Sequence, residues 1–402
     1  MRNVIIIGRN YSSTLGLARS LGEAGYGVRL LALTKNAARI VGQSKYVNKT
    51  ECVACMEHDF FEETSAEEEL RALEALRGGE EKMLIIPCRD ITCLMLEKHW
   101  DRLAEHFYFP NINNTPGELD RFTNKAVQKE LAEKCGLKTA GGKTYSTDEA
   151  GIKQACGEVS FPCFMKPLSS SWTKAEKAFI TVCGNREELR SWMNSAREKG
   201  LCKQVLLEKY LKIDYELSAY GVAADGQVWL PAVVRTIRGG LGSHMGVAAE
   251  GEVVPSDVLG EMKERVVRFV KESGLTGLFC VDMAQCGDGL YFFEINLRAG
   301  GSCYGVTMAG ANLPGALADA VYHGRMDAAG EIREEVRFVS ELIDADNFIQ
   351  GLIPFSTFRK NLRGARRRLV RNADDPKPWR AAKLHLLRLW SVGKAKKLLK
   401  RG

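Results

Sequence analysis

Four side chains suited to metal and phosphate chemistry stand within one short stretch of the sequence. Asp282 and Glu294 lie on either side of Cys286-Gly287-Asp288-Gly289, whose Asp-Gly pair favours a β-hairpin. Pairing about Asp288 sets the two carboxylates opposite each other, and Asn296 projects from the same face as Glu294. Oxygen ligands of this kind suit Mg²⁺. Arg298 adds a planar fork of donors that matches a phosphate or acyl phosphate.

Two apolar runs must position these groups, and they predict the strands of the hairpin at residues 278–284 and 290–295. Beyond them, Gly300 and Gly301 allow the backbone to approach a ligand closely, and Ser302 follows. An exposed hairpin whose polar face meets water is the alternative interpretation. The residues upstream therefore decide between a binding site and a surface turn.

The chain opens with a βαβ unit, which comprises a strand over 4–7, a helix over 14–25 and a strand over 28–33. The glycine fingerprint G-x-G-x-x-G does not follow Gly8, and this argues against a dinucleotide-dependent oxidoreductase. We expect a Rossmann-like layer in which Ser12, next to the helix N-terminus, holds an anionic substrate group, with an ordinary helix cap as the alternative.

A further strand over 83–86 runs into Arg89 and Asp90, where open α/β sheets carry ligands. A helix over 93–107 then closes the first predicted domain. Both charged residues are therefore candidates for contact with the substrate.

The length of 402 residues suits two or three domains, and 45% of the residues are hydrophobic. The apolar stretch at residues 4–7 is too short for a signal peptide, and we expect a cytoplasmic protein. Twelve cysteines are scattered along the chain, as in a reduced protein. The Cys52-x-x-Cys55 pair has His58 nearby but no second pair at zinc-site spacing.

The net charge of +7 conceals an asymmetry between the body and the C-terminal end. Residues 351–402 contain 16 Lys and Arg but only Asp374 and Asp375 as acids, a balance of +14. The preceding residues together carry −7. The overall charge therefore says little about the partners of either part.

The sequence Glu-Ile-Asn-x-Arg after a hairpin resembles the metal-binding end of the ATP-grasp ligases. That family places two lysines, an adenine hinge and a ribose-binding acid upstream, and this chain has candidates for each in the same order. The resemblance implies binding of ATP with a pair of Mg²⁺ ions on Asp282, Glu294 and Asn296. It assigns nucleotide contacts to Lys125, Lys166, Lys177, Glu208, Lys209, Leu211 and Glu216.

Lys125 lies in a helix predicted over 118–135, but Asn124 stands where the family commonly has aspartate. Lys166 belongs to the strand Phe-Pro-Cys-Phe-Met-Lys-Pro. The phosphate-covering loop that follows contains Lys174 and Lys177 but lacks the glycines that are common in the family, so a solvated loop is the alternative there. Glu216 follows Glu208 by eight residues, as in the carboxylating ligases of purine biosynthesis.

A basic, glycine-rich segment separates the next pair of predicted strands, 217–223 and 227–234, from Glu250. Arg235, Arg238 and His244 in this segment are candidates for closing over an acidic substrate, with a plain surface loop as the alternative. Gly301 and Ser302 are expected to offer backbone amides to the same substrate. A helix is predicted over 257–273 and another from Asn312 onward.

Together these features predict an α/β fold with a Rossmann-like domain over 1–115, an ATP-grasp domain over 116–330 and a C-terminal extension over 331–402. The flap of the ATP-grasp domain is expected at about 140–207. Within the superfamily the chain is most similar to carboxylate-amine ligases of the D-aspartate ligase kind. A weaker resemblance links it to one half of the carbamoyl-phosphate synthase large subunit.

The resemblance implies an ATP-dependent ligase that joins a carboxylate to an amine through an acyl phosphate and releases ADP and phosphate. An amino acid or a cell-wall or peptide precursor is the expected substrate, with Arg298 and Asn296 as the catalytic side chains. The alternatives are a carbamoyl-phosphate-synthase-like or carboxylating enzyme, and a catalytically silent ATP-binding scaffold anchored by its basic tail. The oligomeric state stays open.

The tail carries a basic cluster over 359–371 and a helical pattern over 379–390. Trp379, Ala382 and Leu386 share one side of this helix, and basic residues occupy the other, as in elements that lie on a membrane surface. Residues 359–401 therefore predict peripheral membrane contact. The alternatives are a helix packed on the ligase body and, ranked last because no recognisable module is present, nucleic-acid binding.

Overall fold

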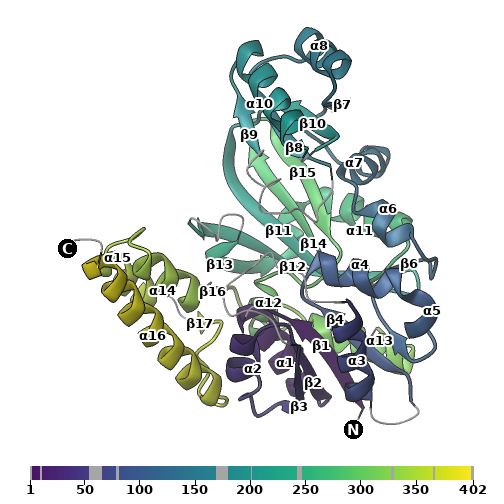
Figure 1. The fold of residues 1–402 in the computed structure, drawn as a ribbon. Coiled ribbons are helices and arrows are strands. Elements are labelled where there is room, and N and C mark those ends of the chain that lie inside the picture. The colour runs from purple at the N-terminus through teal and green to yellow at the C-terminus, as the bar shows by residue number, and fades with distance from the viewer. Residues whose placement is uncertain are drawn as a thin grey trace.

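A computed structural model describes residues 2–9, 11–53, 66–77, 81–168, 180–200, 202–241, 247–326, 330–364 and 367–399. Its strands form three sheets, with helices on their faces (Figure 1). The fold is α/β, as the sequence predicts. Within the described ranges, no helix combines the length and the apolar character needed to cross a membrane.

The N-terminal layer is a parallel sheet in the order β3-β2-β1-β4-β5. The predicted βαβ opening is confirmed as β1 (Asn3–Gly8), α1 (Tyr11–Glu23) and β2 (Gly27–Ala32). The single helix predicted over 93–107 is wrong, because the backbone leaves the helical region at His99. The remaining elements are α2 (Lys35–Val41), β3 (Val47–Cys52), α3 (Ala66–Arg77), β4 (Met83–Pro87), α4 (Asp90–Lys98), α5 (Trp100–Leu103) and β5 (Phe107–Tyr108).

A second, antiparallel sheet in the order β7-β10-β8-β9 stands at the top of Figure 1, beside α8 and α10. We call it the flap sheet. The alternating apolar residues of its strands and two helices enclose a small core of their own. Its elements are β7 (Lys143–Ser146), α8 (Glu149–Glu158), β8 (Cys163–Pro167), β9 (Thr181–Cys183), α10 (Arg186–Glu198) and β10 (Gln204–Lys209).

The central sheet runs β15-β14-β11-β12-β13-β16-β17, and β6 pairs with β14 outside this path. Apolar side chains of α1, α12 and α13 fill the space between it and the N-terminal sheet, so the two layers share one core. The strands are β6 (Asn111–Ile112), β11 (Ile213–Ala224), β12 (Gln227–Gly239), β13 (Ala248–Pro255), β14 (Leu275–Cys286), β15 (Gly289–Asn296), β16 (Val336–Val339) and β17 (Arg367–Arg368).

Two predicted helices of this region are interrupted, each for a local reason. The helix expected over 118–135 divides because the side chain of Asn124 accepts a hydrogen bond from Ala126 and caps the second part. The helix expected over 257–273 divides at Gly260, whose φ of 54° breaks the helical geometry. The resulting helices are α6 (Glu118–Phe122), α7 (Lys125–Lys134), the 3₁₀ turn η2 (Ser256–Leu259), α11 (Met262–Ser273), α12 (Cys303–Met308) and α13 (Leu313–His323).

The C-terminal extension is integrated into the fold, because β16 pairs with β13 and β17 pairs with β16. Its last helix packs against α2 and α14. Ala382 is buried there, and Trp379 and Leu386 pack against the shared core, so this face of the helix contacts protein. The helices are α14 (Glu341–Ile349), α15 (Phe355–Gly364) and α16 (Lys377–Leu399).

Candidate active site

The hairpin β14–β15 sets Asp282 directly opposite Glu294, as predicted. The route to this register differs from the expected one. The turn consists of Gly287 and Asp288, and a regular ladder from it would place Asp282 opposite Phe293. A β-bulge at Phe293 shifts the pairing by one residue and brings the two carboxylates together.

Asp282 is the centre of a hydrogen-bonded group at this point. Its two carboxylate oxygens accept bonds from Ser218 Oγ at 2.6 Å and from Asn296 Nδ2 at 2.8 Å. Ser218 faces Asp282 because β11 pairs with β14 in that register. Arg298 Nη2 in turn donates to Asn296 Oδ1 at 3.3 Å. The predicted metal ligands and the predicted catalytic arginine therefore form one connected cluster.

Glu294 forms an ion pair with Lys125, whose ammonium donates to Oε2. Lys125 begins α7, and the Asn124 cap fixes the position of that first turn. The backbone N–H of Lys125 also donates to Leu168 O at 2.9 Å, which ties α7 to the end of β8. The asparagine that departs from the family pattern thus serves as a helix cap, next to the lysine that the pattern requires.

A second ion pair lies at the flap sheet, where Lys166 Nζ is 2.7 Å from Glu208 Oε2. Strands β8 and β10 carry these residues, and both side chains are buried. Lys129, one helical turn beyond Lys125, approaches the other oxygen of Glu208 at 3.8 Å. Three lysines therefore border the site from α7 and β8.

Burial and charge shape the protonation of this cluster. Burial raises the pKa of Asp282 to about 6, and the nearby Glu294 carboxylate adds to the rise. Burial also acts to raise the pKa of Glu294, but the nearby cations, Lys125 foremost with Lys166 and Arg298, together hold the pKa below its usual value. Burial lowers the pKa of Lys166 despite the opposing pull of Glu208. The site thus holds two buried carboxylates close to each other and to cationic groups.

Arg298 connects the cluster to the N-terminal layer. Its Nε lies 3.0 Å from Asp90 Oδ2, at the start of α4, so this predicted substrate contact instead holds the arginine. The backbone beyond Arg298 packs closely, because a Cβ at Gly300 would stand 2.5 Å from Tyr220 Oη. The N–H of Ser302 donates to the same hydroxyl at 3.3 Å. Asp90 and Tyr220 thus fix the segment from both sides.

Several predicted nucleotide contacts lie at the edge of this group. Glu216 and Lys209 are exposed, and Leu211 is half-buried. The N–H of Lys209, one of the predicted nucleotide contacts, donates to Ala140 O at 3.3 Å. Lys177 lies outside the described residues. The ribose and adenine assignments therefore stay predictions.

The predicted substrate residues divide between two places. Ser12 lies in the first turn of α1, and Arg89 precedes α4, so both follow the carboxyl ends of strands in the N-terminal sheet. Arg238 makes a bidentate ion pair with Asp344 of α14, with distances of 2.6 and 2.7 Å, and Arg235 stands 3.9 Å from Glu252. The structure thus gives Arg238 a partner within the chain.

Two further positions complete the account of the predicted substrate residues. His244 lies outside the described residues. At Gly301, the nearest neighbour of an added Cβ would be Val247 Cγ1 at 3.6 Å, so this glycine has more room than the one before it.

Sequence reasoning missed Ser218, Lys129 and Tyr220. Ser218 follows Glu216 by two residues, so the two side chains lie on the same face of a strand. This spacing could have identified Ser218 from the sequence. The contacts of Lys129 and Tyr220 depend on how separate elements pack. No local pattern could have indicated them.

The donor set fits Mg²⁺. Two carboxylates and an amide oxygen are hard ligands, and a cation would offset both the burial and the nearby Glu294 carboxylate that raise the pKa of Asp282. Within the described residues, no group of three or more His, Cys, Asp or Glu gathers at metal-binding distance. Mg²⁺ commonly keeps several waters and takes phosphate oxygens beside one or two carboxylates, so a protein site for it does not need a full cage of acidic side chains.

Comparison with known proteins identifies an ATP-grasp domain over residues 130–315. The carbamoyl phosphate synthase large chain of Pseudomonas syringae pv. tomato is 25% identical over 311 residues, which are 74% of this chain and 26% of that protein. The formate-dependent phosphoribosylglycinamide formyltransferase of Bacillus subtilis is 28% identical over 227 residues, 54% of each chain. The chain thus spans only a quarter to about half of these relatives.

Solved structures share the fold. Biotin carboxylase from Campylobacter jejuni matches with a TM-score of 0.65 and 15% identity, covering 84% of this chain and 74% of that chain. N5-carboxyaminoimidazole synthetase from Staphylococcus aureus matches with a TM-score of 0.62 and 17% identity, covering 87% and 85%. At these identities the likeness extends to the fold alone.

Proposed function

We propose, from the ATP-grasp domain matched over residues 130–315, that the chain is an ATP-dependent ligase which joins a carboxylate to an amine through an acyl phosphate. The proposed products are an amide, ADP and phosphate. An amino acid or a cell-wall or peptide precursor is the proposed substrate class.

The observation that carries the proposal is the cluster in which Asp282, Glu294, Asn296 and Arg298 are connected, with Lys125 paired to Glu294. Each charged group in it has a chemical task in phosphoryl transfer. An inactive scaffold would not need to hold two buried carboxylates against each other, because such crowding costs stability.

Asp282, Glu294 and Asn296 would hold Mg²⁺, which when bound would neutralise charge on the phosphate oxygens. Lys125 and Lys166 place compact positive charges at the site, and such charges are suited to phosphate oxygens. As the acyl phosphate forms and the amine attacks, Arg298 would stabilise the oxyanion, aimed by its bond to Asp90.

The test is ATP turnover by the purified protein with matched pools of acids and amines. The panel should contain D- and L-amino acids, dipeptides, cell-wall precursors and bicarbonate, because the names of the relatives include carboxylating enzymes. ADP release that requires one acid and one amine, with the amide found by mass spectrometry, supports the proposal. ATP binding without ADP release in any pool favours the scaffold, and a product formed from bicarbonate favours a carboxylating enzyme.

Glu294→Gln tests the metal assignment. It keeps the shape of the side chain but removes the charge that faces Lys125 and the proposed cation, so we expect turnover to fall by a factor of roughly 10³ or more, the scale of a lost charge-stabilising group. Glu272→Gln is the matched control, because that exposed glutamate lies on the surface of α11 beside Arg268. Equal turnover by both variants would rule out Glu294 as a ligand.

A further inference from the structure

The C-terminal extension concentrates exposed apolar side chains and positive charge in one part of the molecule. Among the described residues, the three most exposed large hydrophobic side chains are Leu387, Leu384 and Phe355, with exposed fractions of 62%, 61% and 58%. All three lie within residues 351–402, which carry a charge balance of +14. Exposed apolar side chains bordered by charged residues are a feature of interaction surfaces.

Helix α15 is amphipathic but has no buried residue. Phe355 and Phe358 contact Phe348 of α14 with ring centroids 5.6 Å apart, and these contacts attach the helix to the body. Arg359, Lys360 and Arg363 are exposed on the same helix. Together with Phe355 they line a surface hollow of about 590 Å³. A helix of this kind offers apolar area and cations side by side.

Helix α16 shows two different faces. Ala382 and its apolar neighbours pack on the shared core, so the predicted membrane-binding face is occupied by protein. Leu384 and Leu387 point away from that contact and are flanked by the exposed cations Lys383 and Arg388. The exposed apolar side chains of α16 therefore lie on the side opposite the predicted membrane-binding face.

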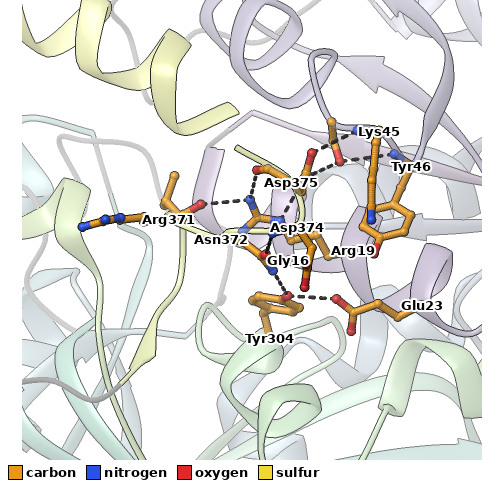
Figure 2. Close-up of polar contacts among 12 residues, drawn as sticks. Gly16, Arg19, Glu23, Lys45, Tyr46, Tyr304, Arg371, Asn372, Asp374 and Asp375 are labelled. Carbon is orange, nitrogen blue, oxygen red and sulfur yellow. Dashed lines mark hydrogen bonds and ion pairs between the residues drawn. The ribbon is translucent and has the colours of Figure 1, made fainter. Parts of the chain in front are cut away.

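The extension is attached to the N-terminal layer by a buried polar group. Figure 2 shows Arg19 of α1 reaching the segment before α16, where its Nε donates to Asp375 Oδ2 at 3.0 Å. Its remaining donors reach the carbonyl oxygens of Leu369, Val370 and Asp375 at 2.9 to 3.1 Å. Both charged side chains are almost fully buried. We call this group the Arg19 clamp.

We propose that the exposed faces of α15 and α16 bind the surface of an anionic lipid bilayer. The cations would meet lipid phosphates, and Phe355, Leu384 and Leu387 would enter the interfacial region between head groups and acyl chains. A nucleic acid would satisfy the cations but would leave the two leucines in water. The combination of charge and aliphatic surface therefore favours lipid.

Co-sedimentation of the full-length protein with vesicles tests this proposal. Vesicles of phosphatidylcholine that contain about one third phosphatidylglycerol should bind the protein at low salt, and pure phosphatidylcholine vesicles should bind it far less. Arg359→Glu/Lys360→Glu/Arg363→Glu should lower the partition coefficient by roughly 100-fold or more, at about a factor of five for each cation lost. Leu384→Ser/Leu387→Ser should lower it by roughly 10-fold.

The matched control is Lys153→Glu/Arg190→Glu/Lys203→Glu, which reverses three exposed cations in the flap region. It changes the net charge equally and should leave vesicle binding close to that of the unaltered protein. Thermal melting and nucleotide binding of each variant establish that it is folded. If the control also loses vesicle binding, net charge alone would explain the loss, and the proposed binding surface would be overturned.

Three other outcomes would overturn the proposal. Equal binding to neutral and anionic vesicles would remove the role of the cations. Binding to RNA that the leucine variant retains, without binding to anionic vesicles, would assign the surface to nucleic acid. A change from dimer to monomer in the leucine variant, again without vesicle binding, would assign the leucines to contact between two copies of the chain.

Discussion

Replacing Asp375 by alanine is expected to release the C-terminal extension from the N-terminal layer. The carboxylate accepts hydrogen bonds from Arg19 Nε at 3.0 Å, Ser44 Oγ at 2.7 Å and the N–H of Lys45 at 3.0 Å. The side chains of Arg19 and Asp375 are 0% and 2% exposed. Asp375→Ala therefore leaves a buried guanidinium with no opposite charge in the clamp.

Breaking a buried ion pair in this way costs about 3 to 5 kcal/mol. Since every 1.4 kcal/mol is a factor of about ten, the population of molecules with an opened extension should rise by a factor between roughly 10² and 4 × 10³. Limited proteolysis measures that population when opening and closing are fast relative to cleavage. Cleavage within residues 365–385 should accelerate by the same factor, with the sites identified by mass spectrometry.

Asp374→Ala is the matched control, because this neighbouring aspartate is exposed. A second variant, Arg19→Met/Asp375→Ala, removes both charges and should open less than Asp375→Ala alone, since no unpaired charge stays buried. The reasoning fails if Asp375→Ala is cleaved no faster than Asp374→Ala. It also fails if the double variant opens more than the single one.

Two further predictions concern the active site. The pKa of Asp282 is raised to about 6, and a metal ion needs the ionised carboxylate, so affinity for Mg²⁺ with ADP should rise about fivefold between pH 5 and pH 6, reach about tenfold by pH 7 and level off above that. Isothermal titration calorimetry of Asp282→Asn distinguishes the ionisation of Asp282 from that of the nucleotide, because the rise in Mg²⁺ affinity with pH should vanish in this variant. An unchanged rise in the variant would contradict the role of Asp282. Gly300→Ala should destabilise the protein by about 1 to 3 kcal/mol and slow turnover, because its Cβ would stand 2.5 Å from the Tyr220 hydroxyl. Gly301→Ala, with 3.6 Å to its nearest neighbour, should have little effect, and equal thermal melts for the two variants would refute the packing argument.

Local patterns predicted much of the arrangement around the hairpin. Alternation along two strands placed Asp282 opposite Glu294, and the order of the motifs brought Lys125 to the same site. The β-bulge at Phe293 reconciles this register with the two-residue turn. It was not predictable, because no residue type in the hairpin indicates a bulge. The helix breaks at Asn124 and Gly260 carried local signals that a search for long helices overlooked.

Contacts between distant elements needed the structure. Asp90 and Arg298 stand more than two hundred residues apart, and the sequence offered one as a substrate contact and the other as a catalytic group. The same holds for Arg238, which the structure pairs with Asp344 of the extension. Each residue type indicated a charge that needs a partner, but the partner depended on how the sheets pack.

The sequence by itself determined the class of fold, the hairpin and the types of group that line the site, because these depend on short-range alternation and spacing. Only the tertiary structure decided which charges neutralise one another and which face of α16 meets solvent. The predicted apolar face of that helix is covered because α2 and α14 lie against it. Burial is a property of the packed elements together, and a periodic pattern in one helix cannot determine it.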